Sequence, residues 1–223
     1  MNLDYRYEIK FVLSTIKFHE AINWLHTCTN ARKAFENRTV NSIYFDDINF
    51  SSVRDNLSGI ANRSKYRLRW YENSEHLNFE EKIKRGRLSG KKIYPINLNR
   101  TLLTSLRMED ISTKLINDLA LKGVLLNNYM MPTLKVSYER DYYETEENIR
   151  ITLDQKINFS DIYLHSILSK EKAINYSMNI MEIKFSPNKK TAVSKLIKSL
   201  NISPTRHSKY LTGMAISTNT YYI

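Results

Sequence analysis

The chain has 223 residues, of which 42% are hydrophobic and 26% charged, as is usual for a globular domain with a substantial core. The five glycines and four prolines are too few for long flexible linkers, and no apolar run approaches the roughly 18 residues of a membrane-spanning helix. A formal net charge of +11 predicts an anionic partner such as nucleic acid, phosphorylated metabolites, polyphosphate or an acidic membrane, although lysines that only confer solubility would give the same charge.

The N-terminus lacks the basic-then-apolar order of a signal peptide. The single cysteine, Cys28, excludes an internal disulfide and a cysteine-based zinc cluster. Both observations favour the cytoplasm. We therefore expect residues 1–223 to form one cytoplasmic domain without a transmembrane segment.

Hydrophobic periodicity predicts an alternation of strands and helices along the chain. In chain order we expect a strand over 5–13, a helix over 14–28, a strand over 40–47, a short helix over 50–57, a hairpin over 65–84, a basic solvated turn over 85–92, a helical region over 97–122, strands over 133–143, 149–154 and 177–185, and a helix from 187 to about 200. Ser14 is placed to cap the first long helix.

The hairpin over 65–84 has a charged face on each of its two strands. Arg67 and Arg69 share a face of the first strand, and Glu80, Lys82 and Lys84 share a face of the second. An ordinary hairpin would turn such charges to water, where Arg67 and Arg69 would form surface ion pairs of little energetic value. The other interpretation is that both faces point into an enclosed space.

Five predicted strands repeat this pattern of a charged face opposite a strongly apolar one. The charged faces are Arg6/Glu8/Lys10, Arg67/Arg69, Glu80/Lys82/Lys84, Arg150/Asp154 and Glu182/Lys184. If the helices cover the apolar faces, the charged faces meet inside a closed sheet, which predicts an α+β fold with an antiparallel β-barrel and flanking helices. An open sheet with a solvated charged face is the alternative.

The charged faces mix basic residues with a minority of carboxylates. Basic residues that bind phosphate oxygens, together with carboxylates that hold a divalent cation, are the combination that phosphoryl chemistry requires. Because mixed charges also occur on ordinary solvated sheets, this signal is weak by itself.

Eight short motifs follow one another along the chain. They are Glu8-Ile9-Lys10, Tyr44-Phe45-Asp46, Arg67-Leu68-Arg69, Glu80-Glu81-Lys82, Tyr138-Glu139-Arg140, Arg150-Ile151-Thr152-Leu153-Asp154, Glu182-Ile183-Lys184 and Ser208-Lys209-Tyr210-Leu211-Thr212-Gly213. Together they resemble the VTC domain, the polyphosphate polymerase domain of the vacuolar transporter chaperone proteins and their bacterial relatives. That domain belongs to the triphosphate tunnel metalloenzyme (CYTH-like) superfamily.

The resemblance implies a tunnel of antiparallel strands with a basic lumen. It also implies transfer of the terminal phosphoryl group of ATP to a growing polyphosphate chain, with Mn²⁺ or Mg²⁺ as the cofactor. The implied phosphate-binding and catalytic residues are Lys10, Arg67, Arg69, Lys82, Arg140, Arg150 and Lys209, with Lys84 and Lys184 as further binding residues. The implied principal metal ligand is Glu182, with Glu8, Glu80 and Asp154 as weaker candidates.

One position departs from the superfamily pattern. The opening Glu-x-Glu-x-Lys is here Arg6-Tyr7-Glu8-Ile9-Lys10, so the first carboxylate is replaced, which argues against the triphosphatase and cyclase branches. Hydrolysis of tripolyphosphate or a nucleoside triphosphate in the same tunnel is still an alternative, as is a polyanion-binding module without turnover. The expected partners are ATP and inorganic polyphosphate or pyrophosphate, with no nucleic acid. The resemblance also allows a membrane-protein partner.

Overall fold

A computed structural model describes residues 4–72, 74–126 and 130–219. The strands of this part of the chain are β1 (Arg6–Leu13), β2 (Arg32–Asp46), β3 (Asn62–Tyr71), β4 (His76–Arg85), β5 (Leu88–Asn99), β6 (Met131–Glu144), β7 (Arg150–Asp161), β8 (Ile174–Tyr176) and β9 (Asn179–Phe185). The helices are α1 (Thr15–Cys28), α2 (Ser51–Leu57), α3 (Arg100–Ser105), α4 (Met108–Leu121), α5 (Lys190–Leu196) and α6 (Lys209–Ser217), with short 3₁₀ turns at Leu168–Lys170, Pro187–Lys189 and Ile197–Ser199.

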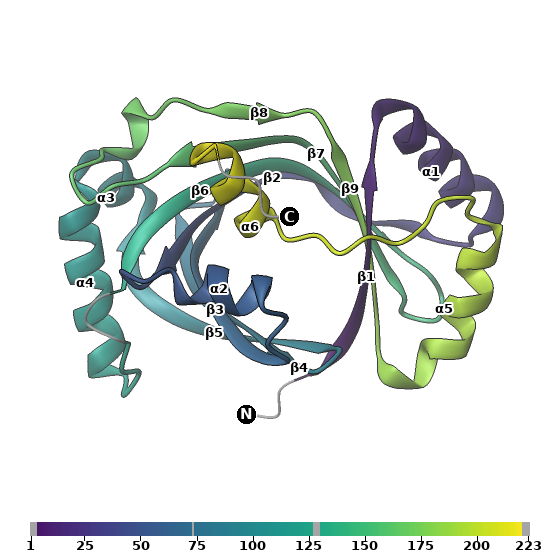
Figure 1. The fold of residues 1–223 in the computed structure, drawn as a ribbon, viewed down its shortest axis with the longest axis horizontal. Helices are drawn as coiled ribbons and strands as arrows, with labels where there is room; N and C mark the ends of the chain where they lie inside the picture. Colours follow the sequence, from purple (N-terminus) through teal and green to yellow (C-terminus); the bar gives the residue numbers. More distant parts are fainter. Residues whose placement is uncertain (1–3, 73, 127–129, 220–223) are drawn as a thin grey trace.

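The sheet closes on itself. Its strand order is β6-β2-β3-β4-β5-β1-β9-β7-β8, and β6 also pairs with β7, which completes a ring of antiparallel strands. Figure 1 shows this ring, with β8 as an extra strand along the outside of β7. The shortest seam joins β1 to β5, where only Arg6–Ser89 and Tyr7–Leu88 are paired. The predicted α+β fold, an antiparallel barrel with flanking helices, is confirmed.

Helices cover the apolar outer faces of the ring on two opposite sides (Figure 1). On one side, α1 and α5 bury Phe18 and Val193 against β1, β7 and β9. On the other, α3 and α4 bury Leu103 and Ile111 against the outer faces of β2 to β5. The charged faces of the strands are thereby directed inward.

A third cluster fills part of one end of the barrel. Helices α2 and α6 lie across the opening of the ring in Figure 1. Tyr210 and Met214 of α6 and Val53 of α2 pack against apolar residues of the strands, among them Val136 and Phe159. Side chains therefore narrow this end, and the polar lumen opens beside them.

One of the sequence predictions was wrong. Residues 85–92 are not a solvated turn, because only Gly86 and Arg87 form the turn and β5 begins at Leu88. Gly86 has φ +57°, the left-handed conformation that allows so tight a connection. The helical region expected over about 97–122 is present as two helices, α3 and α4, and it begins after Asn99, whose side chain accepts a hydrogen bond from the Leu102 amide at 2.9 Å.

Candidate functional site

The inward faces of β1, β3, β4, β6, β7 and β9 bring the predicted charged residues around one lumen. Eleven of the thirteen line its cavities, namely Glu8, Lys10, Arg67, Arg69, Lys82, Lys84, Arg140, Arg150, Glu182, Lys184 and Lys209. The other two, Glu80 and Asp154, lie in the wall and are bonded directly to lining residues. Five other strands, together with Lys209 of α6, thus contribute to the same space as Arg140 of β6.

The lumen contains two cavities that share part of their lining. One encloses about 880 Å³ and the other about 1250 Å³, both including space open to solvent. They share the residues Glu8, Arg67, Arg69, Lys82, Ser89, Arg140 and Lys184. The two cavities therefore adjoin at these side chains, and together they are called the tunnel.

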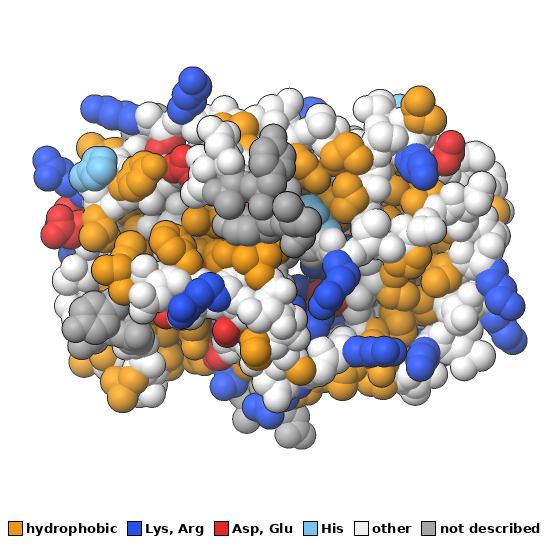
Figure 2. Space-filling model, viewed as in Figure 1, with side chains coloured by type: hydrophobic (Ala, Val, Ile, Leu, Met, Phe, Trp, Pro, Cys, Tyr) orange, Lys and Arg blue, Asp and Glu red, His pale blue; other side chains and the backbone are white. Residues whose placement is uncertain are grey.

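The tunnel has two different mouths. The first lies beside α2 and α6 and is lined by Asn56, Arg63 and Ser208. Figure 2 shows a hollow on this face with Lys and Arg side chains at its edge. The second mouth is lined by Arg6, by Arg150 and by a group of aromatic side chains.

Cations predominate in the tunnel. Thirteen of its lining residues are Lys or Arg and four are Asp or Glu. Glu80 and Asp154 in the wall raise the carboxylates to six, which leaves a formal excess of seven positive charges. Such an excess in an enclosed space favours occupation by an anion.

Glu80 of β4 is held by three cations. Nε of Arg67 donates to Oε2 at 2.7 Å, Nζ of Lys91 donates to Oε1 at 2.8 Å, and Nη1 of Arg69 lies 3.6 Å from Oε2. Burial alone would raise the pKa of Glu80, but the nearby cations outweigh it and lower the pKa below its ordinary value. Both oxygens have protein donors, so Glu80 orients the two arginines instead of offering a free ligand.

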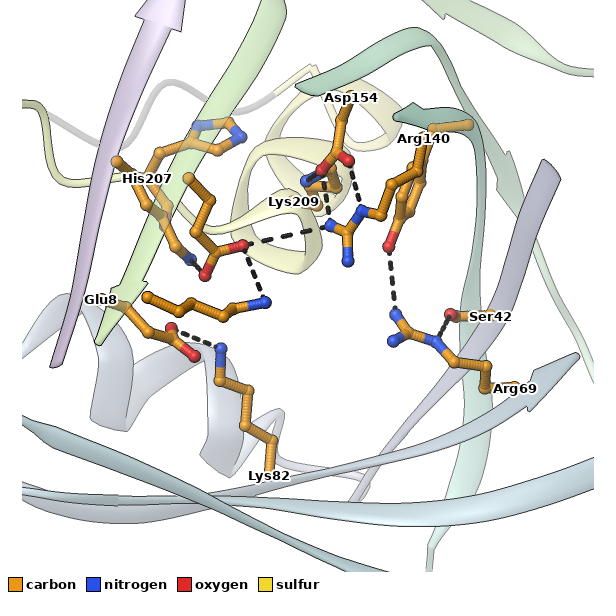
Figure 3. Close-up of polar contacts among 12 residues, drawn as sticks. Glu8, Ser42, Arg69, Lys82, Arg140, Asp154, His207 and Lys209 are labelled. Carbon is orange, nitrogen blue, oxygen red and sulfur yellow. Dashed lines mark hydrogen bonds and ion pairs between the residues drawn. The ribbon is translucent and has the colours of Figure 1, made fainter. Parts of the chain in front are cut away.

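Asp154 of β7 holds Arg140 and Lys209 (Figure 3). Arg140 donates from Nε to Oδ1 at 2.5 Å and from Nη2 to Oδ2 at 2.7 Å, and Nζ of Lys209 donates to Oδ2 at 2.5 Å. Burial opposes ionisation, but Arg140 and Lys209 outweigh it and lower the pKa of Asp154 to about 2. The carboxylate is therefore an anchor for two lumen cations.

Glu182 of β9 is the least satisfied carboxylate of the lumen. Lys184, Lys10 and Arg140 lie 3.5, 3.9 and 4.0 Å from its oxygens, and its buried Oε1 has no hydrogen-bond partner. Burial would raise the pKa of Glu182, but these cations hold it well below the ordinary value. Glu8 of the neighbouring β1 accepts from Nζ of Lys82 at 2.7 Å.

A family profile for the VTC domain matches residues 5–218. The chain belongs to the VTC domain family. The matched span includes every strand of the ring and the whole of α6, and therefore all the elements that carry the lumen. A search of curated proteins finds no match.

Solved structures share the fold of this VTC domain at low sequence identity. HpAC1 of Hippeastrum, for which a dominant triphosphatase activity is described, is 13% identical, with 97% of each chain covered and a TM-score of 0.53. The PH1819 protein of Pyrococcus horikoshii is 14% identical, with 95% of this chain and 99% of that chain covered and a TM-score of 0.51. A Vibrio parahaemolyticus protein described as a candidate adenylate cyclase is 12% identical, with 92% and 97% covered and a TM-score of 0.51. These likenesses show the triphosphate tunnel (CYTH-like) fold.

The metal ligands predicted for the VTC domain fall into two groups. Glu80 and Asp154 are occupied by cations, whereas Oε1 of Glu182 has no hydrogen-bond partner among the described residues. Glu8 is close enough to Glu182 for the two negative charges to affect each other. Over the described ranges, no three His, Cys, Asp or Glu side chains are grouped to hold a metal ion. Mg²⁺ bound together with substrate phosphates needs only one or two protein carboxylates, and Oε1 of Glu182 is a donor of that kind. The same oxygen donors suit Mn²⁺.

Three cations of the VTC domain lumen were missed in the sequence. Arg63 and Lys65 alternate with Arg67 along β3, so the signal was present. Lys65 donates to Oγ of Ser208 at 2.9 Å, and burial, followed by the nearby lysines, lowers its pKa well below the ordinary value. Lys91 was hidden by the wrong assignment of 85–92 as a loop.

Two tyrosines of the VTC domain are part of the site. The hydroxyl of Tyr44 accepts from Arg67 at 3.3 Å, and that of Tyr138 accepts from Arg69 at 3.1 Å. Nζ of Lys209 also lies 4.7 Å from the ring centroid of Tyr138. Both tyrosines combine packing at the end of the barrel with orientation of lumen cations.

The remaining predicted cations occupy different depths. Lys184 is common to both cavities, and burial, opposed by Glu182, lowers its pKa to about 8. Lys84 lies toward the α2–α6 mouth. Arg150 lies only at the other mouth, where its side chain is 50% exposed and donates to Glu144 at 3.1 Å. Across the described residues, no helix has both the length and the apolar character needed to cross a membrane.

Proposed function

We propose that this VTC domain, with residues 1–223 acting as one polymerase domain, transfers the terminal phosphoryl group of ATP to the end of an inorganic polyphosphate chain. The supporting observation is a lumen of two adjoining cavities, each with its own mouth, that carries a formal excess of seven positive charges. A linear polyanion suits such a passage, because successive Lys and Arg side chains can neutralise the charges along its length.

Preorganised arginines support this proposal. Arg67 and Arg140 are fixed by Glu80 and Asp154, so their remaining N–H groups are already directed before a substrate enters. Planar guanidinium groups can bind phosphate oxygens in a bidentate manner. Donors held in place before the reaction stabilise the charge that develops during transfer without reorganising.

In the proposed step, a terminal oxygen of the polyphosphate chain attacks the γ-phosphorus of ATP. A new P–O bond forms, the bond between the γ-phosphorus and the β–γ bridging oxygen breaks, and ADP leaves with that electron pair. An ionised phosphate oxygen needs neither a protein nucleophile nor a general base. Held by Glu182 and Glu8, Mn²⁺ or Mg²⁺ would supply positive charge that neutralises the phosphate oxygens.

Hydrolysis of ATP or tripolyphosphate is the second candidate. It is favoured by Oε1 of Glu182, which lacks a hydrogen-bond partner and could orient a water molecule toward the same phosphorus. Water would then replace the acceptor phosphate, and orthophosphate would be released. Binding of polyanions without turnover is the third outcome to distinguish.

The test follows ADP and acid-stable polymer together, using purified protein, ATP and Mn²⁺. Glu182→Gln is the test variant, and Glu139→Gln is the matched control because Glu139 pairs with the exposed Lys156 outside the cavity linings. Polymer that forms in step with ADP, is lost in Glu182→Gln and persists in the control supports the polymerase. ADP with free phosphate but no polymer assigns hydrolysis. Polyphosphate binding without any product contradicts the catalytic proposal.

A further inference from the structure

The tunnel mouth at Arg150 carries a cluster of aromatic side chains. Phe35, Tyr71 and Tyr142 line this end of the cavity. The rings of Phe35 and Tyr142 meet edge to face with centroids 5.8 Å apart, and Cζ of Arg38 lies 5.6 Å from the centroids of both Phe35 and Tyr71. Phe35 is nevertheless 52% exposed, so much of an apolar ring faces the water at the mouth.

A β-bulge puts Phe35 in this position. Arg38 of β2 pairs with Arg140 of β6, so uninterrupted antiparallel pairing would place Glu36 opposite Tyr142. Register shifts on both sides of Phe35 place it opposite Tyr142 instead. Bulges re-aim side chains and are over-represented beside active sites. Here the bulge replaces a carboxylate with an aromatic ring at the entrance to a phosphate-binding tunnel.

The aromatic cluster adjoins the phosphate-binding residues. The ring centroid of Tyr142 lies 5.8 Å from Cζ of Arg140, the arginine that Asp154 fixes in the lumen. At the other mouth, the tyrosines among the described lining residues, Tyr44 and Tyr138, are buried. Only the Phe35 mouth thus combines an exposed aromatic ring with nearby phosphate-binding groups among the described parts of the two mouths.

We propose that Phe35 and Tyr142 form a stacking site for the nucleobase of the phosphoryl donor, which enters by this mouth with its triphosphate directed toward Arg140. This inference rests on the proposed function, in which a nucleoside triphosphate is the donor. Stacking on aromatic rings tolerates different bases because every base has a π face. ATP and GTP are therefore expected to bind with similar affinity.

Calorimetric titration of ATP and of tripolyphosphate tests this site, since tripolyphosphate has as many phosphates but no base. The titrations are made with EDTA to prevent turnover. Phe35→Ala is expected to weaken ATP binding about 5- to 150-fold and to leave tripolyphosphate binding unchanged. Phe35→Trp, which keeps an aromatic ring, is expected to retain the affinity for ATP. The matched control is Tyr163→Ala, which removes an exposed aromatic side chain outside the cavity lining and should change neither affinity.

The outcomes separate this site from the proposed function. Unchanged ATP binding by Phe35→Ala would overturn the stacking site, and so would equal losses for ATP and tripolyphosphate, which would mean that Phe35 only shapes the mouth. In both cases wild-type binding of tripolyphosphate would leave the phosphate tunnel intact. Wild-type protein that binds neither ligand, either with EDTA or with Mg²⁺ present, would instead overturn the proposed function, and the stacking site with it.

Discussion

Arg140 of β6 and Asp154 of β7 are directly opposite each other in the barrel wall, and two hydrogen bonds of 2.5 and 2.7 Å join their side chains. Asp154 is fully buried and also accepts from Lys209 of α6. It therefore ties a helix at one end of the barrel to a cation of the lumen. Glu80 of β4 likewise fixes a lumen cation, Arg67 of the neighbouring β3.

Replacement of Asp154 should destabilise the fold. Asp154→Ala leaves Arg140 and Lys209 without their counter-charge, and breaking a buried pair in this way costs about 3–5 kcal/mol. Urea unfolding measures the loss. The control, Glu144→Ala, removes the partner of the half-exposed Arg150 and should cost at most about 1 kcal/mol. Equal small losses in both variants would contradict the anchoring role of Asp154.

Glu182 should determine the dependence on metal concentration. In Glu182→Gln we expect turnover to be lost at Mn²⁺ concentrations that saturate the wild type, and any residual turnover to need at least about 10- to 100-fold more Mn²⁺ for its half-maximum, since even groups that only support a metal ligand contribute that much. Glu80→Gln should lower stability and phosphate affinity without moving the Mn²⁺ midpoint, because both Glu80 oxygens already have protein donors. An unchanged midpoint in Glu182→Gln would rule out Glu182 as a ligand.

A buried arginine of the tunnel should contribute more to the affinity for tripolyphosphate than an arginine at a mouth. Arg69 is buried and common to both cavities, so Arg69→Ala is expected to reduce the affinity for tripolyphosphate about 100-fold. Arg150 lies at a mouth and is half exposed, so Arg150→Ala should reduce affinity less than about tenfold. Titration of both variants at one salt concentration makes the comparison, and equal losses would contradict it.

The protonation of Lys65 should make phosphate binding sensitive to alkaline pH. Burial first, then Lys10, Lys82 and Arg63, hold the pKa of Lys65 below its ordinary value, with Asp46 opposing. At pH values below that lowered pKa, Lys65 is charged in both states and its burial lowers the stability of the fold by the full amount. As pH rises toward the ordinary lysine pKa of about 10.4, the stability of the fold increases, because the unfolded chain then binds more protons than the folded one.

Loss of the Lys65 proton also removes an attraction for phosphate. We expect the affinity for tripolyphosphate to fall more steeply in the wild type than in Lys65→Arg as the pH rises from neutral toward the ordinary lysine pKa, because arginine stays protonated throughout this range. Other lysines of the lumen affect both proteins alike. Parallel pH profiles would therefore contradict a titrating Lys65.

The close approach of α6 to the barrel depends on Gly213. A Cβ at Gly213 would overlap Cδ2 of Leu134 and lie 2.6 Å from Cδ1 of Phe159. Gly213→Ala should therefore displace α6, cost about 1–3 kcal/mol and weaken polyphosphate binding through Lys209. Gly86→Ala is the comparison: its positive φ should cost about 1 kcal/mol, but no atom lies near the added methyl group and binding should persist. Normal binding by Gly213→Ala would contradict this role.

Strand alternation predicted the charged faces, and the resemblance to the VTC domain decided between a lumen and a solvated sheet. Arg67 and Glu182 share such faces because the side-chain period of a strand is two, and both line the lumen. The same rule could have included Lys65. The rule could not have identified Lys91, because the glycines and basic residues around Gly86 resemble a loop. Only the pairing of β5 with β4 in the structure shows that Lys91 lies in a strand.

Side-chain alternation along a strand does not show which residue lies opposite on the neighbouring strand, and part of the site depends on that pairing. Whether a carboxylate is free or occupied depends on the residue opposite it, as for Asp154 facing Arg140, and a single sequence does not show that pairing. The aromatic mouth was missed for a related reason. Phe35 turns toward Tyr142 only because a bulge shifts the register of β2 by one residue, and nothing in the local pattern signals that shift.

A single-turnover experiment with ATP labelled at the γ-phosphorus tests the transfer reaction most directly. The protein is mixed with labelled ATP, Mn²⁺ and unlabelled tripolyphosphate, beside Glu182→Gln, and the labelled products are separated. Transfer to a phosphate acceptor predicts label in tetrapolyphosphate in an amount equal to the ADP formed, with neither product from the variant. Label recovered entirely as orthophosphate, with the tripolyphosphate unchanged in length, would contradict the polymerase.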